Sequence, residues 1–178
     1  MSTQEIDLLV IGAGPFGLAV AAQASHLGIE HRVVGTPMEF WRKNMPAGML
    51  LRSACDWHLD PVNVHTIGNF LAERGQTVKD IEPLSLDFYL SYAEWFQKQK
   101  QITAMPWHIQ RLDTANGHFI ATTTDGDTID ARNVVITSMP ATQDFGPFFA
   151  FTISVRVSAR LICEAVGQDL QDVSGITG

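Results

Sequence analysis

A glycine loop near the start of the chain constrains the fold more than any other feature. Residues 6–11 are almost all apolar, and the pattern G-x-G-x-x-G follows at residues 12–17, leading into an alanine-rich segment. This order predicts a buried strand, a tight turn and a helix, an arrangement that binds the pyrophosphate of a dinucleotide. The candidate dinucleotide contacts are therefore Gly12, Gly14, Pro15, Phe16 and Gly17.

Each part of the loop has its own expected role. Gly12 allows the turn, Gly14 lets the pyrophosphate approach the backbone, and Gly17 lets the helix pack closely on the sheet. The helix N-terminus offers partial positive charge and unpaired N–H groups to the anion. Pro15 suits the first helical position, and Gly28 is expected to end the helix. The alternative is a glycine-rich turn that binds nothing.

The composition excludes several classes of function. At 178 residues the chain is long enough for one domain with a substantial core. Its net charge of −7 argues against non-specific binding to nucleic acids or anionic membranes. Its 2 cysteines are too few for a disulfide framework, so a cytoplasmic location is expected. The apolar run 8–24 contains glycines and a proline, which predicts a strand and a helix rather than a signal peptide or membrane span.

The second predicted strand, residues 31–34, lacks the acidic residue that usually follows it in nicotinamide-binding folds. That residue holds the ribose, and Gly35 and Thr36 stand in its place. Arg42 and Lys43 follow soon after. Two interpretations stay open for these cations: they bind a 2′-phosphate, or they are solvated surface charges.

The middle of the chain predicts a long loop and two helices. Residues 44–65 show no clear period, which favours an ordered loop with a function. Helices are expected at about 67–74 and 86–100, each preceded by a capping residue, Thr66 and Ser85. The second helix carries an aromatic stripe, which favours core packing over a platform for a cofactor.

The residues from about 107 to 170 predict a β-meander followed by a long helix. Strands at about 107–114 and 118–124 flank Asn116-Gly117, a strong hairpin signal, and a buried strand follows at 133–137. Together they favour a small antiparallel sheet laid over a parallel one. Apolar residues then recur every three or four positions, which predicts an amphipathic helix over about 147–170. One face of this helix is expected to pack on the sheet, with oligomerisation as the alternative.

These residues resemble the FAD-binding part of class B flavin-dependent monooxygenases and their bacterial relatives. The likeness rests on the glycine loop at 12–17, on 35–41 leading to 45–53, on the end of the meander at 130–136, and on 139–147 with the helix that follows. It implies an α/β, Rossmann-like, three-layer FAD/NAD(P)-binding domain with a parallel sheet and a β-meander. Residues 1–178 would form a single FAD-binding domain.

Two departures from the family pattern limit what the resemblance implies. Relatives have Ala-Thr-Gly after the strand that matches 133–136, where this chain has Thr137, Ser138 and Met139. Relatives also carry a second glycine motif in an NADPH-binding domain, and this sequence has none. The NADPH domain is thus expected to be absent by internal deletion, with a junction near 136–139. Unrelated sequence after a truncation is the alternative, and the regular helical period near the C-terminus favours the deletion.

The resemblance also implies where FAD would lie. The glycine loop would hold the pyrophosphate, Gly35 and Thr36 would lie near the adenosine ribose, and Ile109 would meet the adenine with its backbone. Gly146 and Pro147 would start a helix directed at the pyrimidine edge of the flavin, where a helix N-terminus stabilises negative charge. The other cofactor contacts would be Trp41, Met49, Leu51, Arg52 and Ser53 along the isoalloxazine ring, and Thr137 and Ser138.

No acid–base pair or nucleophile identifies a catalytic centre. His58 and His65 match no familiar metal-binding spacing, so no metal is expected. Cys55 is interpreted as a buried structural thiol rather than a reactive one, and a surface salt bridge is the alternative role for Arg52. Because a flavin supplies the chemistry in a flavoenzyme, missing side-chain catalysts do not exclude an enzyme.

Three functions remain open at this point. The first is an FAD-dependent oxidoreductase of monooxygenase ancestry that acts on an unknown small molecule, with its flavin reduced by the substrate, by an external reductase or by a partner chain. The second is a minimal FAD-binding module without turnover. The third is a nicotinamide-binding Rossmann domain that never binds flavin.

Overall fold

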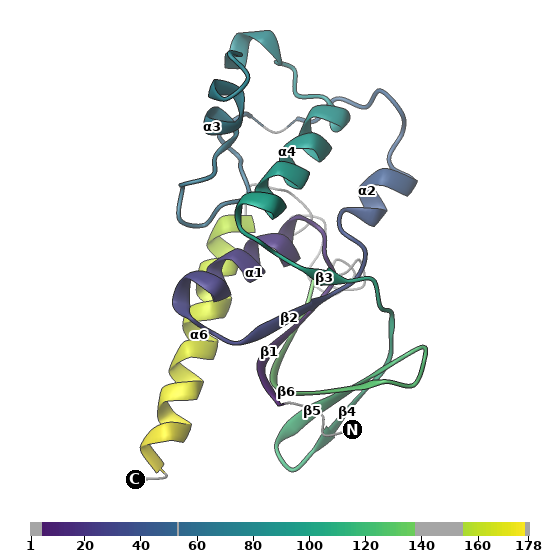
Figure 1. Ribbon diagram of the computed structural model, residues 1–178, viewed down its shortest axis with the longest axis vertical. Coiled ribbons are helices and arrows are strands. Elements are labelled where there is room, and N and C mark those ends of the chain that lie inside the picture. The colour runs from purple at the N-terminus through teal and green to yellow at the C-terminus, as the bar shows by residue number, and fades with distance from the viewer. Residues whose placement is uncertain (1–4, 53, 138–154, 177–178) are drawn as a thin grey trace.

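A computed structural model describes residues 5–52, 54–137 and 155–176, the last five by backbone alone (Figure 1). The elements form a six-stranded sheet with helices packed against it. In chain order they are β1 (Ile6–Ile11), α1 (Pro15–Leu27), β2 (His31–Val34), α2 (Glu39–Asn44), α3 (Ile67–Ala72), the 3₁₀ turn Val78–Asp80, α4 (Leu86–Gln99), β3 (Ala104–Met105), β4 (Ile109–Ala115), β5 (His118–Thr123), β6 (Thr128–Ile136) and α6 (Val155–Ile176).

The sheet has the strand order β3-β2-β1-β6-β5-β4. The first four strands in this order run parallel, and β5 and β4 are antiparallel to their neighbours. Strand β6 belongs to both parts, because Thr128–Ala131 pair with β5 while Ala131–Ile136 pair with β1. The parallel part and the meander predicted from the sequence are therefore joined through one strand.

The predicted meander lies over one face of the parallel strands. A smaller core cluster joins Leu9 and Val34 of the parallel strands to Ala121 and Ile129 of the meander. Because side chains alternate across a strand, Leu8 and Val10 point to the opposite face and join the larger core with the helices. Helices, parallel strands and meander form the three layers that the sequence predicts, and the α/β, Rossmann-like fold class is confirmed.

Several local predictions are confirmed together with their causes. Asn116 and Gly117 have φ of 54° and 81°, as a tight two-residue hairpin turn requires, and they join β4 to β5. The hydroxyl of Thr66 accepts from the N–H of Asn69 at the start of α3, and that of Ser85 accepts from Phe88 at the start of α4. Side chains therefore cap both helices where the sequence predicts it.

The last helix differs in part from its prediction. Its start at 147 lies outside the described residues, and α6 runs on to Ile176 rather than to about 170. Its buried residues Val155, Ala159 and Cys163 face α1, and the Cys163 thiol contacts the carbonyl oxygen of Val20 at 3.6 Å. The apolar face packs mainly on α1 rather than on the sheet, and the two helices lie side by side in Figure 1.

Three short elements, α2, the 3₁₀ turn Val78–Asp80 and β3, were not predicted, and one predicted strand was too short. Strand β3 has two residues and helix α2 has no buried residue, so neither leaves an apolar period in the sequence. Strand β6 begins at Thr128 rather than 133, and the side chain of Ile136 is 49% exposed. The predicted buried strand is the C-terminal half of a longer strand whose end reaches the surface.

Candidate functional site

The glycine loop lies where three parallel strands end side by side. The N–H of Gly12 donates to the carbonyl oxygen of Val34 at the end of β2, at 2.8 Å. On the other side, Thr137 follows β6, and its hydroxyl donates to the carbonyl oxygen of Gly12 at 2.9 Å. The backbone N–H of Thr137 donates to the carbonyl oxygen of Ile11 at 2.8 Å. Ligands of open parallel sheets bind at this carboxyl edge of the strands.

The three motif glycines have different surroundings. Gly12 has φ of 110°, which side chains rarely tolerate. A Cβ on Gly17 would lie 1.8 Å from the carbonyl oxygen of Gly12, so the helix passes too close to the turn for any side chain. A Cβ on Gly14 would meet no atom of the described residues within 4 Å. Backbone conformation therefore explains Gly12 and packing explains Gly17, but neither explains Gly14, whose missing side chain leaves room beside the loop.

Helix α1 begins directly behind this room. Gly14 is its N-cap residue, no side chain caps it, and Pro15 follows in the first turn. Phe16 packs against the larger core, which holds the first turn in place. The positive end of the helix dipole is thus directed to the loop. This geometry fits the pyrophosphate contact predicted for the loop, which stays a prediction.

The end of β2 approaches the glycine loop closely. Gly35 has φ of 123°, and a Cβ there would lie 3.3 Å from the backbone nitrogen of Ala13. Thr36 follows and is exposed. Backbone geometry thus explains why glycine stands at the position where an acidic residue usually follows this strand. Both residues lie beside the loop, as a ribose-binding role would require.

The two cations after β2 are in ion pairs with carboxylates. The Arg42 guanidinium lies 2.7 Å from Oε1 of Glu94 on α4, and Lys43 pairs with Glu39 one turn earlier on α2. Both side chains are well exposed. These contacts favour the interpretation as solvated surface charges over a 2′-phosphate site.

The predicted isoalloxazine contacts gather at the start of α4. The N–H of Leu51 donates to the carbonyl oxygen of Leu84 at 2.7 Å, and the carbonyl oxygen of Met49 accepts from the N–H of Leu86 at 2.9 Å. Beside this contact is an open hollow, lined by Leu51, Arg52, Ala54, Glu82, Pro83 and Leu84. The structure therefore brings Leu51 and Arg52 together at one hollow, with Met49 next to it.

Trp41 approaches the same helix from α2. Its ring packs on that of Tyr89, with centroids 5.3 Å apart. Ile109, by contrast, starts β4 and packs against the smaller core on the meander side of the sheet. Its predicted backbone contact with adenine stays a prediction. Ser53, Ser138, Gly146 and Pro147 lie outside the described residues.

The aromatic residues of α4 form core, as the sequence predicts. Tyr89, Tyr92 and Phe96 are fully buried, whereas Phe88 and Trp95 are partly buried against the same cluster. Rings from α3 and α2 join them, such as Phe70, whose centroid is 5.7 Å from that of Tyr92.

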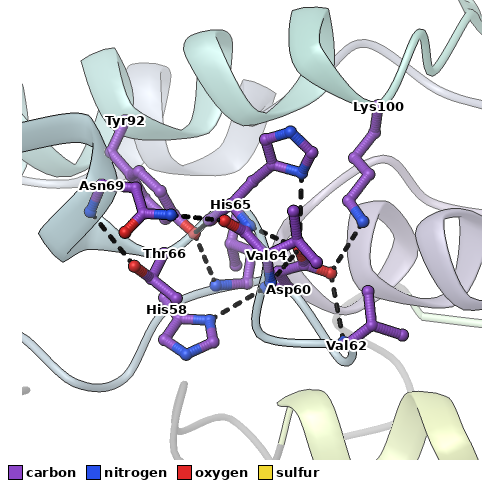
Figure 2. Close-up of polar contacts among 10 residues, drawn as sticks. His58, Asp60, Val62, Val64, His65, Thr66, Asn69, Tyr92 and Lys100 are labelled. Atoms are coloured by element: carbon purple, nitrogen blue, oxygen red, sulfur yellow. Dashed lines mark hydrogen bonds and ion pairs between the residues drawn. The ribbon is translucent and has the colours of Figure 1, made fainter. Parts of the chain in front are cut away.

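His58 and His65 lie beside a buried acidic residue, Asp60: His58 faces its backbone N–H, and Nδ1 of His65 lies 3.5 Å from its carboxylate. Asp60 is fully buried and accepts N–H bonds from Val64 at 3.0 Å and from His65 at 2.7 Å. Its other oxygen lies 3.0 Å from Nζ of Lys100 at the end of α4. Figure 2 shows these contacts converging on Asp60. No group of three His, Cys, Asp or Glu in the described parts of the chain could hold a metal ion.

Charge compensation keeps Asp60 ionised. Burial alone would raise its pKa, but the backbone N–H groups and Lys100 outweigh this effect, and its pKa lies below the ordinary value. Sequence reasoning considered the neighbouring histidines and missed this residue. The one local indication was an Asp before a proline in a loop, which is typical of a side chain that bonds nearby backbone N–H groups.

Both cysteines are buried and free. Burial, followed by a hydrogen bond with Glu82, raises the pKa of the Cys55 thiol to about 11. Burial also raises the pKa of Cys163 to about 11. Thiolates are the reactive form, so the prediction of Cys55 as a structural thiol agrees with its surroundings.

Comparisons with known proteins bear on the fold and the ancestry. No family model matches the chain. Thioredoxin reductase of Helicobacter pylori is 28% identical over 134 residues, which are 74% of this chain and 34% of that protein. A flavin-containing monooxygenase from Stenotrophomonas maltophilia has a TM-score of 0.61 at 18% identity, over 75% of this chain and 38% of its own.

A second kind of oxidoreductase has the same fold. Bacillithiol disulfide reductase from Staphylococcus aureus has a TM-score of 0.58 at 23% identity, over 76% of this chain and 38% of its own. The chain thus spans little more than a third of the length of these relatives. It has the Rossmann-like fold of FAD-dependent monooxygenases and thioredoxin-reductase-like disulfide reductases, which supports an ancestry among flavoprotein oxidoreductases. None of the helices in the described ranges is both long and apolar enough to cross a membrane.

Proposed function

We propose that the chain binds FAD through the glycine loop and serves as the flavin domain of an oxidoreductase. The observation that carries the proposal is the contrast between Gly14 and Gly17. Gly17 is required because a Cβ there would lie 1.8 Å from the carbonyl oxygen of Gly12, whereas Gly14 has no packing reason among the described residues and borders free space at a helix N-terminus. A pyrophosphate that approaches the backbone accounts for this difference.

Flavin accounts for the surroundings better than a nicotinamide nucleotide does. The strand after α1 ends in Gly35 rather than in an acidic residue, and Arg42 and Lys43 are in ion pairs with Glu94 and Glu39. The hollow beside Leu51 and Arg52 lies in the segment whose sequence resembles the isoalloxazine side of flavin monooxygenases. When bound, FAD would supply the electron-transfer chemistry, and this chain would bind and orient it.

We further propose that electrons reach this flavin from outside the chain, through the substrate, an external reductase or a partner chain. The sequence has a single glycine motif, and we infer that an NADPH-binding domain is missing at a junction near residues 136–139. The thiols do not favour disulfide chemistry within the chain, because Cys55 and Cys163 are both buried with raised pKa values. A monooxygenase-like reaction on a small molecule is therefore the proposed activity.

An absorption spectrum tests the first proposal directly. The purified chain is incubated with FAD, separated from free cofactor by gel filtration and scanned. Two flavin bands that co-elute with the protein are expected, and a protein that retains NADPH but no flavin would contradict the proposal. Adding NADPH to the FAD complex tests the second proposal, because slow or absent bleaching is expected. Rapid bleaching by NADPH alone would show that the chain takes up these electrons itself.

A further inference from the structure

Two buried tyrosines on α4 differ sharply in their hydrogen bonding. The hydroxyl of Tyr92 donates to the carbonyl oxygen of His65 at 2.8 Å and accepts from the N–H of Leu59 at 3.0 Å. The hydroxyl of Tyr89, one turn earlier, is equally buried, yet no described residue hydrogen-bonds to it. A buried polar group without a partner destabilises the folded protein. The protein therefore carries a polar group at Tyr89 whose partner has to be accounted for.

Tyr89 lies on α4 near the hollow beside Leu51, but it is fully buried and does not line the hollow. Side chains on an α-helix lean toward its N-terminus, so Tyr89 extends over the first turn of α4. Leu84, which precedes that turn, lines the hollow together with Leu51 and Arg52. Tyr89 also packs on Trp41, 5.3 Å between ring centroids. Its neighbours thus include residues from the segment whose sequence resembles the isoalloxazine side of flavin monooxygenases.

A ligand reaches the Tyr89 hydroxyl only when a neighbouring side chain moves. Trp41 is the ring that packs on Tyr89 from α2, and Trp41 itself is only partly buried. Helix α2 has no buried residue, and its ion pair with α4, Arg42 with Glu94, is exposed. Exposed ion pairs contribute little. A ligand at this hydroxyl therefore displaces Trp41, whose ring packs against the larger core, together with α2.

We propose that the Tyr89 hydroxyl forms a hydrogen bond with a polar edge atom of the isoalloxazine ring of bound FAD. The inference rests on the proposed function, since it requires that the chain binds this cofactor. The ring has carbonyl oxygens, bare nitrogens and an N–H group, so a phenol that both donates and accepts finds a partner there. Tyr89 is then a positioning residue for the flavin, and the hydrogen bond compensates the cost of its burial.

The test compares Tyr89→Phe with Tyr92→Phe in the full chain. Each substitution removes one buried hydroxyl and keeps the ring, so Tyr92→Phe is the matched control. FAD is titrated into each protein freed of cofactor, and flavin fluorescence gives the dissociation constant. For Tyr89→Phe we expect FAD binding weakened by about three- to tenfold, a shifted flavin absorption band, and unchanged or improved thermal stability without FAD. For Tyr92→Phe we expect lower stability without FAD and an unchanged dissociation constant.

The possible outcomes separate this inference from the proposed function. If the unsubstituted chain binds no FAD, the proposed function fails and the inference fails with it. If the unsubstituted chain and Tyr89→Phe bind FAD equally, with the same spectrum, only the inference is overturned. A loss of stability without FAD in Tyr89→Phe that matches the loss in Tyr92→Phe would also overturn it, because the hydroxyl would then have its partner within the chain.

Discussion

The Nη1 atom of Arg156 lies 2.7 Å from Nε2 of His58, which ties the start of α6 to the loop between α2 and α3. Arg156 also donates to Oδ1 of Asn63 at 3.2 Å. A guanidinium only donates, and a neutral imidazole has one acceptor nitrogen. The N–H of Asp60 also lies 3.2 Å from Nδ1 of His58, and the shorter contact assigns the acceptor role to Nε2. The contact thus requires His58 to be neutral.

This requirement predicts a pH dependence of stability. Burial, followed by the Arg156 charge, lowers the pKa of His58 from 6.5 to about 4 in the folded protein. Between these pH values the unfolded chain binds a proton that the folded chain does not, so stability falls as the pH falls from about 6.5 to about 4. The loss is expected to reach at most about 3 kcal/mol. Urea unfolding at a series of pH values measures it.

The control for this prediction is His58→Gln, which keeps an acceptor and removes the titration. Its stability is expected to change less over the same pH window. Asp60 has a lowered pKa and loses its contribution only below its ordinary value of 3.8, so its effect falls outside the window. Equal slopes for His58→Gln and the unsubstituted chain would show that His58 is not the titrating group.

Replacing the buried carboxylate is expected to be far more damaging than replacing an exposed one. Asp60→Asn leaves Lys100 without its ion-pair partner and places amide hydrogens against backbone N–H donors. The expected loss is about 3–5 kcal/mol in the free energy of unfolding. Asp113→Asn breaks a 2.7 Å ion pair with Arg111 that is solvent-exposed, and its expected loss is below about 1 kcal/mol. Chemical denaturation measures the free energy of unfolding of both variants, and equal losses would contradict the role given to Asp60.

The packing of the glycine loop predicts that Gly17→Ala destabilises the fold. The added Cβ would lie 1.8 Å from the carbonyl oxygen of Gly12, so the first turn of α1 or the loop must shift. A thermal scan should show a large drop in the melting temperature or no folded protein. Gly167→Ala is the control, since a Cβ there meets no atom within 4 Å in the part of the chain that the structure describes, and alanine is favoured inside a helix. A Gly17→Ala protein as stable as this control would refute the close approach.

Gly14→Ala separates cofactor binding from folding. Gly14 has φ of −78°, which alanine adopts readily, and the new Cβ meets no atom of the described residues within 4 Å. The variant is expected to fold like the unsubstituted chain, while the methyl group enters the space assigned to the pyrophosphate. A decrease in FAD affinity of at least about tenfold is expected, measured by the fluorescence titration described above. Unchanged affinity in a folded Gly14→Ala protein would exclude this side of the loop as the binding surface.

The thiols provide a chemical test of burial. With pKa values near 11, Cys55 and Cys163 carry little thiolate at pH 8 and are shielded from solvent. Alkylation of these thiols by iodoacetamide is expected to be slow in the folded protein and fast in urea. Mass spectrometry measures the extent of alkylation over time. Rapid labelling of either thiol in the folded state would reopen a reactive role for that cysteine.

The sequence predicts those parts of the fold in which local chemistry and burial agree. The glycine loop, the caps Thr66 and Ser85 and the Asn116-Gly117 turn are determined by residues close to one another in the chain. Helix α2 and strand β3 escape prediction because they bury too little to leave a period. The docking of α6 on α1 depends on contacts such as Cys163 with Val20, which no local pattern encodes.

The candidate site divides in a similar way. The glycine loop can be located from spacing alone, because the turn, the strand and the helix are continuous in sequence. The bond from Thr137 to Gly12 joins segments far apart in the chain. Asp60 was overlooked because its partners are mainly backbone N–H groups and a lysine at the end of a distant helix. Such sites become visible only in three dimensions.

The sharing of β6 between the two parts of the sheet has a consequence for how the protein opens. The meander pairs with the first half of this strand, and β1 pairs with the second half, up to the residue before Thr137. Detaching the meander would therefore loosen β6, whose second half pairs with β1 and is followed by the Thr137 contact with Gly12, so local opening of the hairpin and loosening of the loop are expected to form one cooperative event. Amide hydrogens in β5 and around Gly12 should then exchange with solvent at matching rates, and a ligand held by the loop should slow exchange in the meander as well.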